Sequence, residues 1–214
     1  MQYLLVANYG DGTASVLPID KATGALLPAT DTVHDVGSGP VPGRQDGPHC
    51  HEVISVPVGN CDPPDPRCDA FVFVPDLGID KVMQWRLDGP TGQLTPNAAS
   101  PFFSTQPGVG PRHMAFSPSA DVAYVLGELD ASITIVSYNR TAGVLDKQLD
   151  KISTLPPGVE RTGVFPAELI ISPDGRFLYC SNRGDEGVLH HNSIAVFSIA
   201  RGSASVHKVS LPLL

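Results

Sequence analysis

The stretch Ser172-Pro-Asp-Gly-Arg-Phe-Leu-Tyr-Cys-Ser-Asn-Arg-Gly184 contains a turn and the strand that leaves it. Ser-Pro-Asp-Gly is a turn sequence, because proline presets the backbone for the second turn position and Asp and Gly suit the positions that follow. The apolar and aromatic run that starts at Phe177 is typical of a buried strand, and the polar residues and glycine after it indicate a second turn. The stretch therefore predicts turn, strand and turn.

The same strand pattern occurs four times along the chain, in segments that begin at Tyr3, Phe71, Val122 and Phe177. Each segment leads into a second apolar run, and these runs are Ala14–Ile19, Val82–Leu87, Ile133–Tyr138 and Ile194–Ile199. Two such runs joined by a short polar link predict a β-hairpin. The first three hairpins align without a gap, and the fourth aligns after the extra residues Gly187–Asn192.

A further strand-like element precedes three of the hairpins and ends in proline each time: His51–Pro57, Arg112–Pro118 and Ala167–Pro173. The hairpin starts are 68, 51 and 55 residues apart, and the first step is lengthened by the Gly/Pro-rich segment 37–47 and by the loop between Cys61 and Cys68. A unit of about 50 residues with four strands is the period of a β-propeller blade. We therefore expect an all-β fold with a partial blade at 1–47 and blades at 48–110, 111–165 and 166–214.

The composition supports this fold class and excludes others. The 214 residues include 21 Gly and 21 Pro, which argues against long helices, and the apolar share of 42% is sufficient for a core. No apolar run reaches the ~18–20 residues of a membrane span. The net charge of −8, without a block of like charge, argues against a nucleic-acid surface. Because Met1–Val6 lack the pattern of a secretory signal, we expect a cytoplasmic protein with no membrane contact.

The four cysteines lack the spacing of a zinc site or of a disulfide framework. Cys61 and Cys68 flank a proline-rich loop, which leaves two alternatives open. They are either reduced thiols or, in an oxidising compartment, a disulfide that closes the loop.

Blade geometry predicts where functional side chains gather. Successive blades of a propeller are rotated about one axis, so aligned positions lie on a common ring around the central channel. The position six residues before the blade proline is occupied by His51, Arg112 and Ala167. The position at the end of the next strand is occupied by Tyr9, Leu77, Glu128 and Arg183. We therefore expect one imidazole, one carboxylate and two guanidiniums to meet near the axis.

Five motifs in this order resemble the seven-bladed propeller lactonases, which include the cycloisomerase-type 6-phosphogluconolactonases and the fungal carboxy-cis,cis-muconate cyclases. They are Pro48-His-Cys-His51, Phe73-Val-Pro-Asp-Leu-Gly78, Gly110-Pro-Arg-His-Met-Ala-Phe116, Gly127-Glu-Leu-Asp130 and Ser172–Gly184. The resemblance covers about residues 3–200. It implies that His51 is the active-site histidine, that Arg112 and Arg183 contact the substrate, and that Glu128 is the acid/base carboxylate.

The resemblance implies a hydrolase for an anionic sugar lactone such as 6-phosphogluconolactone. Two arginines would grip the anion and stabilise the developing negative charge. Glu128 would activate water while His51 protonates the leaving ring oxygen, or the two roles would be reversed. We expect His49 to contact the substrate as well. It shares a strand face with His51, as in a metal site, but no third ligand is evident, so we expect neither a metal nor an organic cofactor.

Other interpretations of these residues stay open. The same channel could close or open the ring of a carboxylated muconate, or the propeller could be a binding scaffold without catalysis. Arg183 could form a surface pair with Asp185 or Glu186. We expect His113 and His190-His191 to be structural or exposed.

The chain is short for the family that it resembles. Seven blades of about 50 residues need about 350 residues, so the sequence predicts an incomplete propeller of three whole blades and a partial one, as in a fragment or a truncated form. An open arc exposes a strand edge and an apolar blade face at each end. Self-association through these edges is therefore expected.

Overall fold

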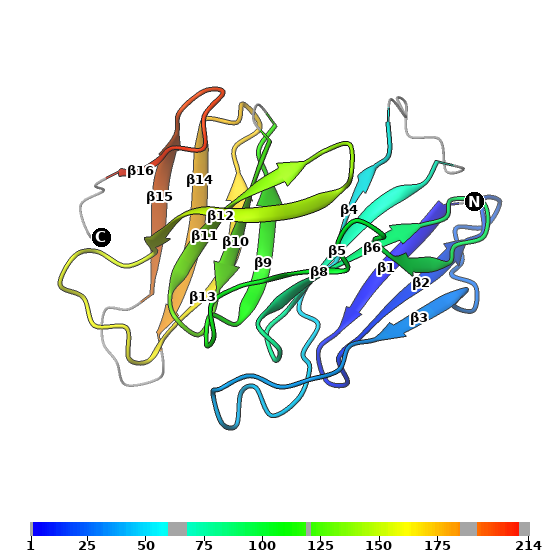
Figure 1. The fold of residues 1–214 in the computed structure, drawn as a ribbon, viewed down its shortest axis with the longest axis horizontal. Coiled ribbons are helices and arrows are strands. Elements are labelled where there is room, and N and C mark those ends of the chain that lie inside the picture. The colour runs from blue at the N-terminus through cyan, green and yellow to red at the C-terminus, as the bar shows by residue number, and fades with distance from the viewer. Residues whose placement is uncertain (1, 60–67, 119–120, 185–191, 210–214) are drawn as a thin grey trace.

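The computed structural model describes residues 2–59, 68–118, 121–184 and 192–209, and the regular structure within these ranges is entirely β-strand. The strands form four antiparallel sheets that follow one another along the chain (Figure 1). The first and the fourth sheet lie toward opposite ends of the long axis (Figure 1). Within the described ranges, no helix is present that could span a lipid bilayer.

The four sheets correspond to one partial and three whole blades. The first consists of β1 (Gln2–Asn8), β2 (Thr13–Ile19) and β3 (Asp31–His34). The second consists of β4 (Ile54–Pro57), β5 (Ala70–Asp76), β6 (Lys81–Leu87), β7 (Leu94–Pro96) and β8 (Phe102–Ser104). The third consists of β9 (Pro111–Phe116), β10 (Val122–Gly127), β11 (Ser132–Asn139) and β12 (Val144–Ser153). The fourth consists of β13 (Val164–Ile171), β14 (Phe177–Gly184), β15 (Ser193–Ile199) and β16 (Val206–Val209). The expected all-β propeller arc is confirmed, although β13 begins two residues before the predicted blade start at 166.

The second sheet differs from the expected four-stranded blade because its outer strand is interrupted. β7 pairs with the residues Trp85–Leu87 of β6, whereas β8 pairs with the residues Lys81–Met83. The two short strands therefore share the edge that β12 covers alone in the third sheet. Residues 97–101 separate them.

The first three predicted hairpins share one turn geometry. The residue pairs that close the first three are Asn8 with Thr13, Asp76 with Lys81 and Gly127 with Ser132. In each turn the last residue has a positive φ, namely 65° at Gly12, 55° at Asp80 and 53° at Ala131. A common turn gives the residue after each strand the same position relative to its sheet, which supports the alignment of Tyr9, Leu77 and Glu128.

Apolar side chains fill the spaces between neighbouring sheets. Val16 of the first sheet packs in one cluster with Val72 of the second, and Phe73 of the second packs with Val125 of the third. Leu126 of the third packs with Phe197 of the fourth. Because the middle sheets are covered on both faces, all residues of β5 and β10 are buried, whereas burial alternates along β14 at the end of the arc.

Several expectations concern residues outside the described ranges. Cys61, Asp185, Glu186 and His190-His191 belong to this group. Cys68 is disulfide-bonded, which agrees with the second of the two alternatives for that residue, and its expected partner Cys61 is not described. Cys50 and Cys180 are free, buried thiols.

Candidate active site

Glu128 lies at the centre of the candidate site. It directly follows β10, and its backbone N–H donates to the carbonyl of Gly110 at 2.9 Å. The side chain is almost entirely buried, yet three guanidinium groups bond to it. Arg44 donates to Oε1, and Arg112 Nε and Arg183 Nη2 each donate to Oε2 at 2.8 Å. Three cations on one carboxylate leave the cluster with an excess of positive charge.

The arginines decide the protonation state of Glu128. Burial alone would raise its pKa, because a buried carboxylate loses hydration. The hydrogen bond from Arg44 and the charges of Arg183 and Arg112 outweigh burial and hold the pKa of Glu128 below its ordinary value. Glu128 is therefore a carboxylate at neutral pH and a weak acceptor for a further proton.

His51 approaches the same carboxylate, with Nε2 3.9 Å from Oε2 of Glu128. Burial, together with the charge of Arg112, lowers the pKa of His51 to about 4. Within the described ranges, the buried Nδ1 atom of His51 has no hydrogen-bond partner. The ring is thus neutral at physiological pH and retains a basic nitrogen.

His49 and His51, which were predicted to share one strand face, have different surroundings. His49 does not contact Glu128. Its ring stacks on Tyr9 with the centroids 4.4 Å apart, and its Nδ1 lies 2.9 Å from the Tyr9 carbonyl oxygen. Tyr9 also meets the ring of His51 edge-on at 5.2 Å, so it joins both histidines at the rim of the site.

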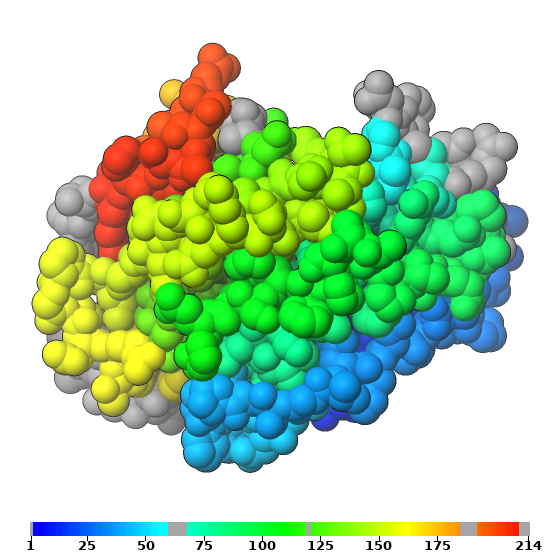
Figure 2. Space-filling view, viewed as in Figure 1, coloured from blue at the N-terminus to red at the C-terminus, as the bar shows by residue number. Residues whose placement is uncertain are grey.

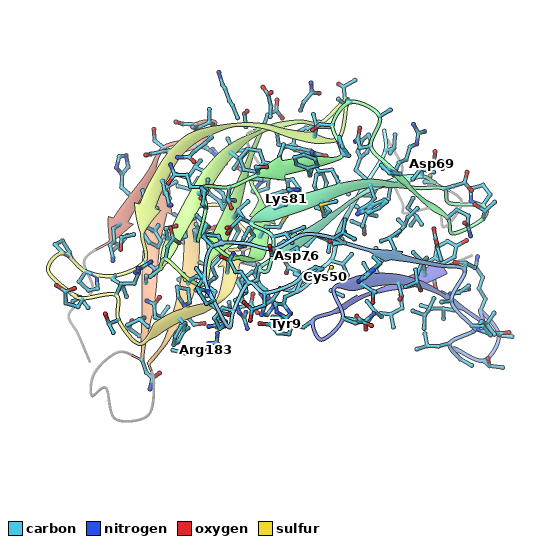
Figure 3. The ribbon with its side chains drawn as sticks, turned by 60° about the horizontal axis from the view of Figure 1, so that its bottom comes forward. Tyr9, Cys50, Asp69, Asp76, Lys81 and Arg183 are labelled. Carbon is cyan, nitrogen blue, oxygen red and sulfur yellow. The ribbon has the colours of Figure 1, made fainter. Side chains whose placement is uncertain are left out.

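The first and the fourth sheet both place residues at the site. Figure 3 shows Tyr9, from the first hairpin turn, and Arg183, from β14, on the same lower side of the molecule. Arg183 also donates from Nε to the carbonyl of Phe165 at 3.2 Å. The four residues predicted from the aligned positions, His51, Arg112, Glu128 and Arg183, therefore do lie together.

His113, which was expected to be structural or exposed, lies next to the site. It is half-buried, its ring lies 5.5 Å from that of His51, and its Nδ1 is 2.9 Å from Glu168 Oε1. Arg112 Nη1 lies 3.2 Å from the other ring nitrogen. Glu52 is 3.9 Å from His113, and burial raises the pKa of Glu52 to about 7. His113, Glu52 and Glu168 therefore form a second layer of titratable groups next to Arg112.

Arg44 is the site residue that the sequence reasoning missed. It lies in the Gly/Pro-rich segment 37–47, which interrupts the repeat and has no aligned counterpart in the other blades. The other residues of this segment are mostly glycine, proline and small polar residues that suit turns. One arginine among them is the signal that could have identified it.

The described residues bring together one group of three side chains with metal-ligating atoms, Asp35, Cys50 and Asp76, all buried within 4.8 Å of one another. Neither His49 nor His51 belongs to it. The Cys50 thiol donates to Asp35 at 3.2 Å, and Asp76 accepts from the backbone N–H groups of His49 and Gly78. The cluster therefore satisfies its own hydrogen bonds and supports the segment that carries the two histidines.

Comparison with known proteins is consistent with this geometry. Residues 1–211 match the family described as lactonase, 7-bladed beta-propeller. A 6-phosphogluconolactonase of Bacillus subtilis is 34% identical over 212 residues, which cover 98% of this chain and 54% of that protein. A periplasmic gluconolactonase of Pseudomonas aeruginosa, PpgL, superposes with a TM-score of 0.77 at 32% identity, over 98% of this chain and 53% of the other. A protein of Lactobacillus plantarum superposes with a TM-score of 0.79 at 34% identity, over 98% and 53%. The chain spans about half the length of these relatives, and it belongs to the family of seven-bladed β-propeller lactonases.

Proposed function

We propose that the protein hydrolyses an anionic sugar lactone such as 6-phosphogluconolactone. The observation that carries this proposal is a neutral imidazole, His51, beside a carboxylate that holds three guanidiniums. Water activation and anion binding are the two requirements of the reaction, and this cluster supplies both. The names of the relatives support the same chemistry.

The hydrogen bonds favour one of the two role assignments. Both oxygens of Glu128 already accept from Arg44, Arg112 or Arg183, so we assign Glu128 the task of orienting the arginines, whereas Nδ1 of the neutral His51 ring has no described partner. His51 takes a proton from water as the hydroxyl oxygen attacks the lactone carbonyl carbon. Arg112, the arginine whose charge acts most strongly on His51, is assigned to the oxyanion. The C–O bond of the ring then breaks, and the imidazolium returns its proton to the leaving ring oxygen.

Arg183 suits the role of anion contact. Its side chain is 49% exposed, and its Nη1 atom takes part in none of the hydrogen bonds described above. His49, at the rim next to Tyr9, is assigned to the sugar hydroxyl groups. The cytoplasmic location expected from the sequence stays a prediction.

The test is lactone hydrolysis above the spontaneous rate. We expect His51→Asn to reduce kcat by about 10²- to 10⁴-fold and Arg183→Ala to raise KM, in variants that remain folded. Arg176→Ala is the control, because Arg176 pairs with Asp174 in an exposed turn far from Glu128. Turnover of a carboxylated muconate alone would contradict the proposal, and a folded protein without turnover would favour the scaffold interpretation.

A further inference from the structure

Arg44 reaches the site from a loop whose shape is set by buried contacts. Gln45 is fully buried, its Nε2 donates to the carbonyl of Leu77 at 2.7 Å, and its Oε1 accepts from the Val41 N–H at 3.1 Å. A Cβ at Gly39 would lie 2.5 Å from the Gln45 side chain, so only glycine fits there. The backbone on both sides of Arg44 is therefore held before any ligand arrives.

This loop carries Arg44 from the first sheet to the third and fourth. After β3 the chain runs along the lower edge of the molecule toward its middle (Figures 1 and 2). The Arg44 guanidinium bonds to Glu128, which follows β10, and lies 5.4 Å from the ring centroid of Phe165 in β13. Arg183 bonds to the same Glu128 carboxylate and to the carbonyl of Phe165. Arg44 and Arg183 therefore flank one carboxylate and one phenylalanine.

The three arginines differ in how much of each guanidinium faces solvent. The Arg112 side chain is 14% exposed, and it donates to Glu128 and to the carbonyl of Ala167 and approaches His113. The Arg44 side chain is 33% exposed and that of Arg183 is 49% exposed. Arg44 and Arg183 are thus the two cations that a ligand can reach.

The charge of the cluster suits a dianion. Glu128 is one carboxylate for three guanidiniums, and Glu168, which bonds to His113, lies on the side of Arg112, so the remaining positive charge lies at Arg44 and Arg183. A phosphate monoester carries close to two negative charges at neutral pH, and planar guanidinium forks match its oxygen atoms. A neutral sugar lactone would leave both charges without a counter-ion.

We propose that Arg44 and Arg183 form a clamp for the phosphate group of a sugar phosphate, and that Arg44 makes the site selective for phosphorylated over unphosphorylated lactones. This inference rests on the proposed function for the identity of the sugar, but the clamp itself depends only on the two guanidiniums.

The first experiment compares 6-phosphogluconolactone with glucono-1,5-lactone. Arg44→Gln should lower the ratio of their kcat/KM values by about 10- to 100-fold, since hydrogen bonds to charged groups contribute about 1.5–3 kcal/mol. Arg44→Lys should lose part of the ratio, because an ammonium group keeps the charge without the fork. The control is Arg161→Gln, since Arg161 is exposed and donates to the carbonyl of Leu129, next to Glu128. An unchanged ratio in Arg44→Gln would overturn the inference.

The second experiment measures binding without turnover, by calorimetric titration with 6-phosphogluconate and with gluconate. We expect the protein to bind the phosphorylated acid more tightly and Arg44→Gln to lose this difference. If the protein prefers the phosphorylated acid but hydrolyses no lactone, the proposed function fails and the clamp stands. Equal affinity for the two acids overturns the clamp whatever the catalytic result.

Discussion

His51 combines a buried ring with a nearby guanidinium, and both disfavour its charged form. A histidine whose pKa is lowered to about 4 is in its basic form at every pH above that value. For the free enzyme, kcat/KM should therefore rise tenfold per pH unit below about 4 and be level above about 5, after subtraction of spontaneous hydrolysis.

An acidic limb near pH 6.5, the ordinary value for histidine, would contradict this assignment. The comparison variant is Glu128→Gln, because the negative charge of Glu128 raises the pKa of His51. Its removal should move the titration of the His51 ring, followed by NMR, to lower pH. This readout does not depend on residual activity.

Asp35 is the second residue with a marked shift. Burial raises the pKa of Asp35 to about 7. The hydrogen bond from the Cys50 thiol acts against this shift, and the negative charge of Asp76 adds to it. A carboxyl group with a raised pKa binds more protons in the folded state, so its contribution to stability is lost as the pH rises from about 4 to 7. Asp35→Asn should therefore stabilise the protein relative to the parent at pH 8 by on the order of 2 kcal/mol more than at pH 5.

Urea unfolding at the two pH values measures this difference. Asp76→Ala is the contrasting variant, because it removes the Oδ1 atom that accepts two backbone N–H groups, so it should destabilise the protein at both pH values. An equal effect of Asp35→Asn at pH 5 and pH 8 would show that Asp35 does not hold the extra proton.

At the scale of single elements, the aligned glycines of the first two hairpin turns have opposite surroundings. A Cβ at Gly78 would lie 1.8 Å from the carbonyl oxygen of Gly47, whereas a Cβ at Gly10 would meet nothing within 4 Å. Gly78→Ala should displace the backbone that carries His49 and His51, with a loss of stability of about 2 kcal/mol or more and a loss of the lactone hydrolysis that we propose. Gly10→Ala should leave thermal stability nearly unchanged. Similar melting temperatures for the two variants would refute the assigned packing.

The repeat explains which elements could be predicted from sequence. The second strands of the hairpins begin within one residue of the predicted Ala14, Val82, Ile133 and Ile194. Alternation and turn residues are local signals, so they locate strands that pair with their neighbours in sequence. The interrupted outer edge formed by β7 and β8 was not predicted, because short edge strands carry little apolar pattern.

The same reasoning separates the site residues that were expected from those that were not. Glu128 and Arg183 occupy aligned positions, so rotation about one axis brings them together without knowledge of any contact. Arg44 meets them through a loop whose path depends on Gln45 and on long-range packing, and no alignment of blades contains that information. His113 contacts Glu168, which belongs to another blade, and the sequence around His113 gives no sign of this partner.

At the scale of the whole molecule, the outer face of the fourth sheet carries apolar side chains that the described part of the chain leaves exposed. Ile170, Tyr179 and Ile194 lie on this face with exposed fractions of 56%, 38% and 65%. The strand pairing places them on one side, opposite the side that packs on the third sheet. An apolar face of this kind favours association.

We therefore expect analytical ultracentrifugation to show self-association of this chain that depends on concentration. The double variant Ile170→Lys/Ile194→Lys should shift the distribution toward the monomer. Leu149→Lys is the control, because Leu149 is similarly exposed but lies on β12. A strictly monomeric parent chain would remove this expectation.

The delivery of Arg44 by a loop has an evolutionary consequence. Strand residues of a propeller cannot be inserted or deleted without a shift in pairing, whereas the segment between β3 and His49 has no strand pairing to keep, and the contacts of Gln45 and Gly39 hold only part of it. Substitutions in this segment can change which sugar lactones are bound, while Glu128 and the blades stay unchanged. The substrate range of such a protein can therefore change through substitutions in one short loop, faster than the residues that carry out the reaction change.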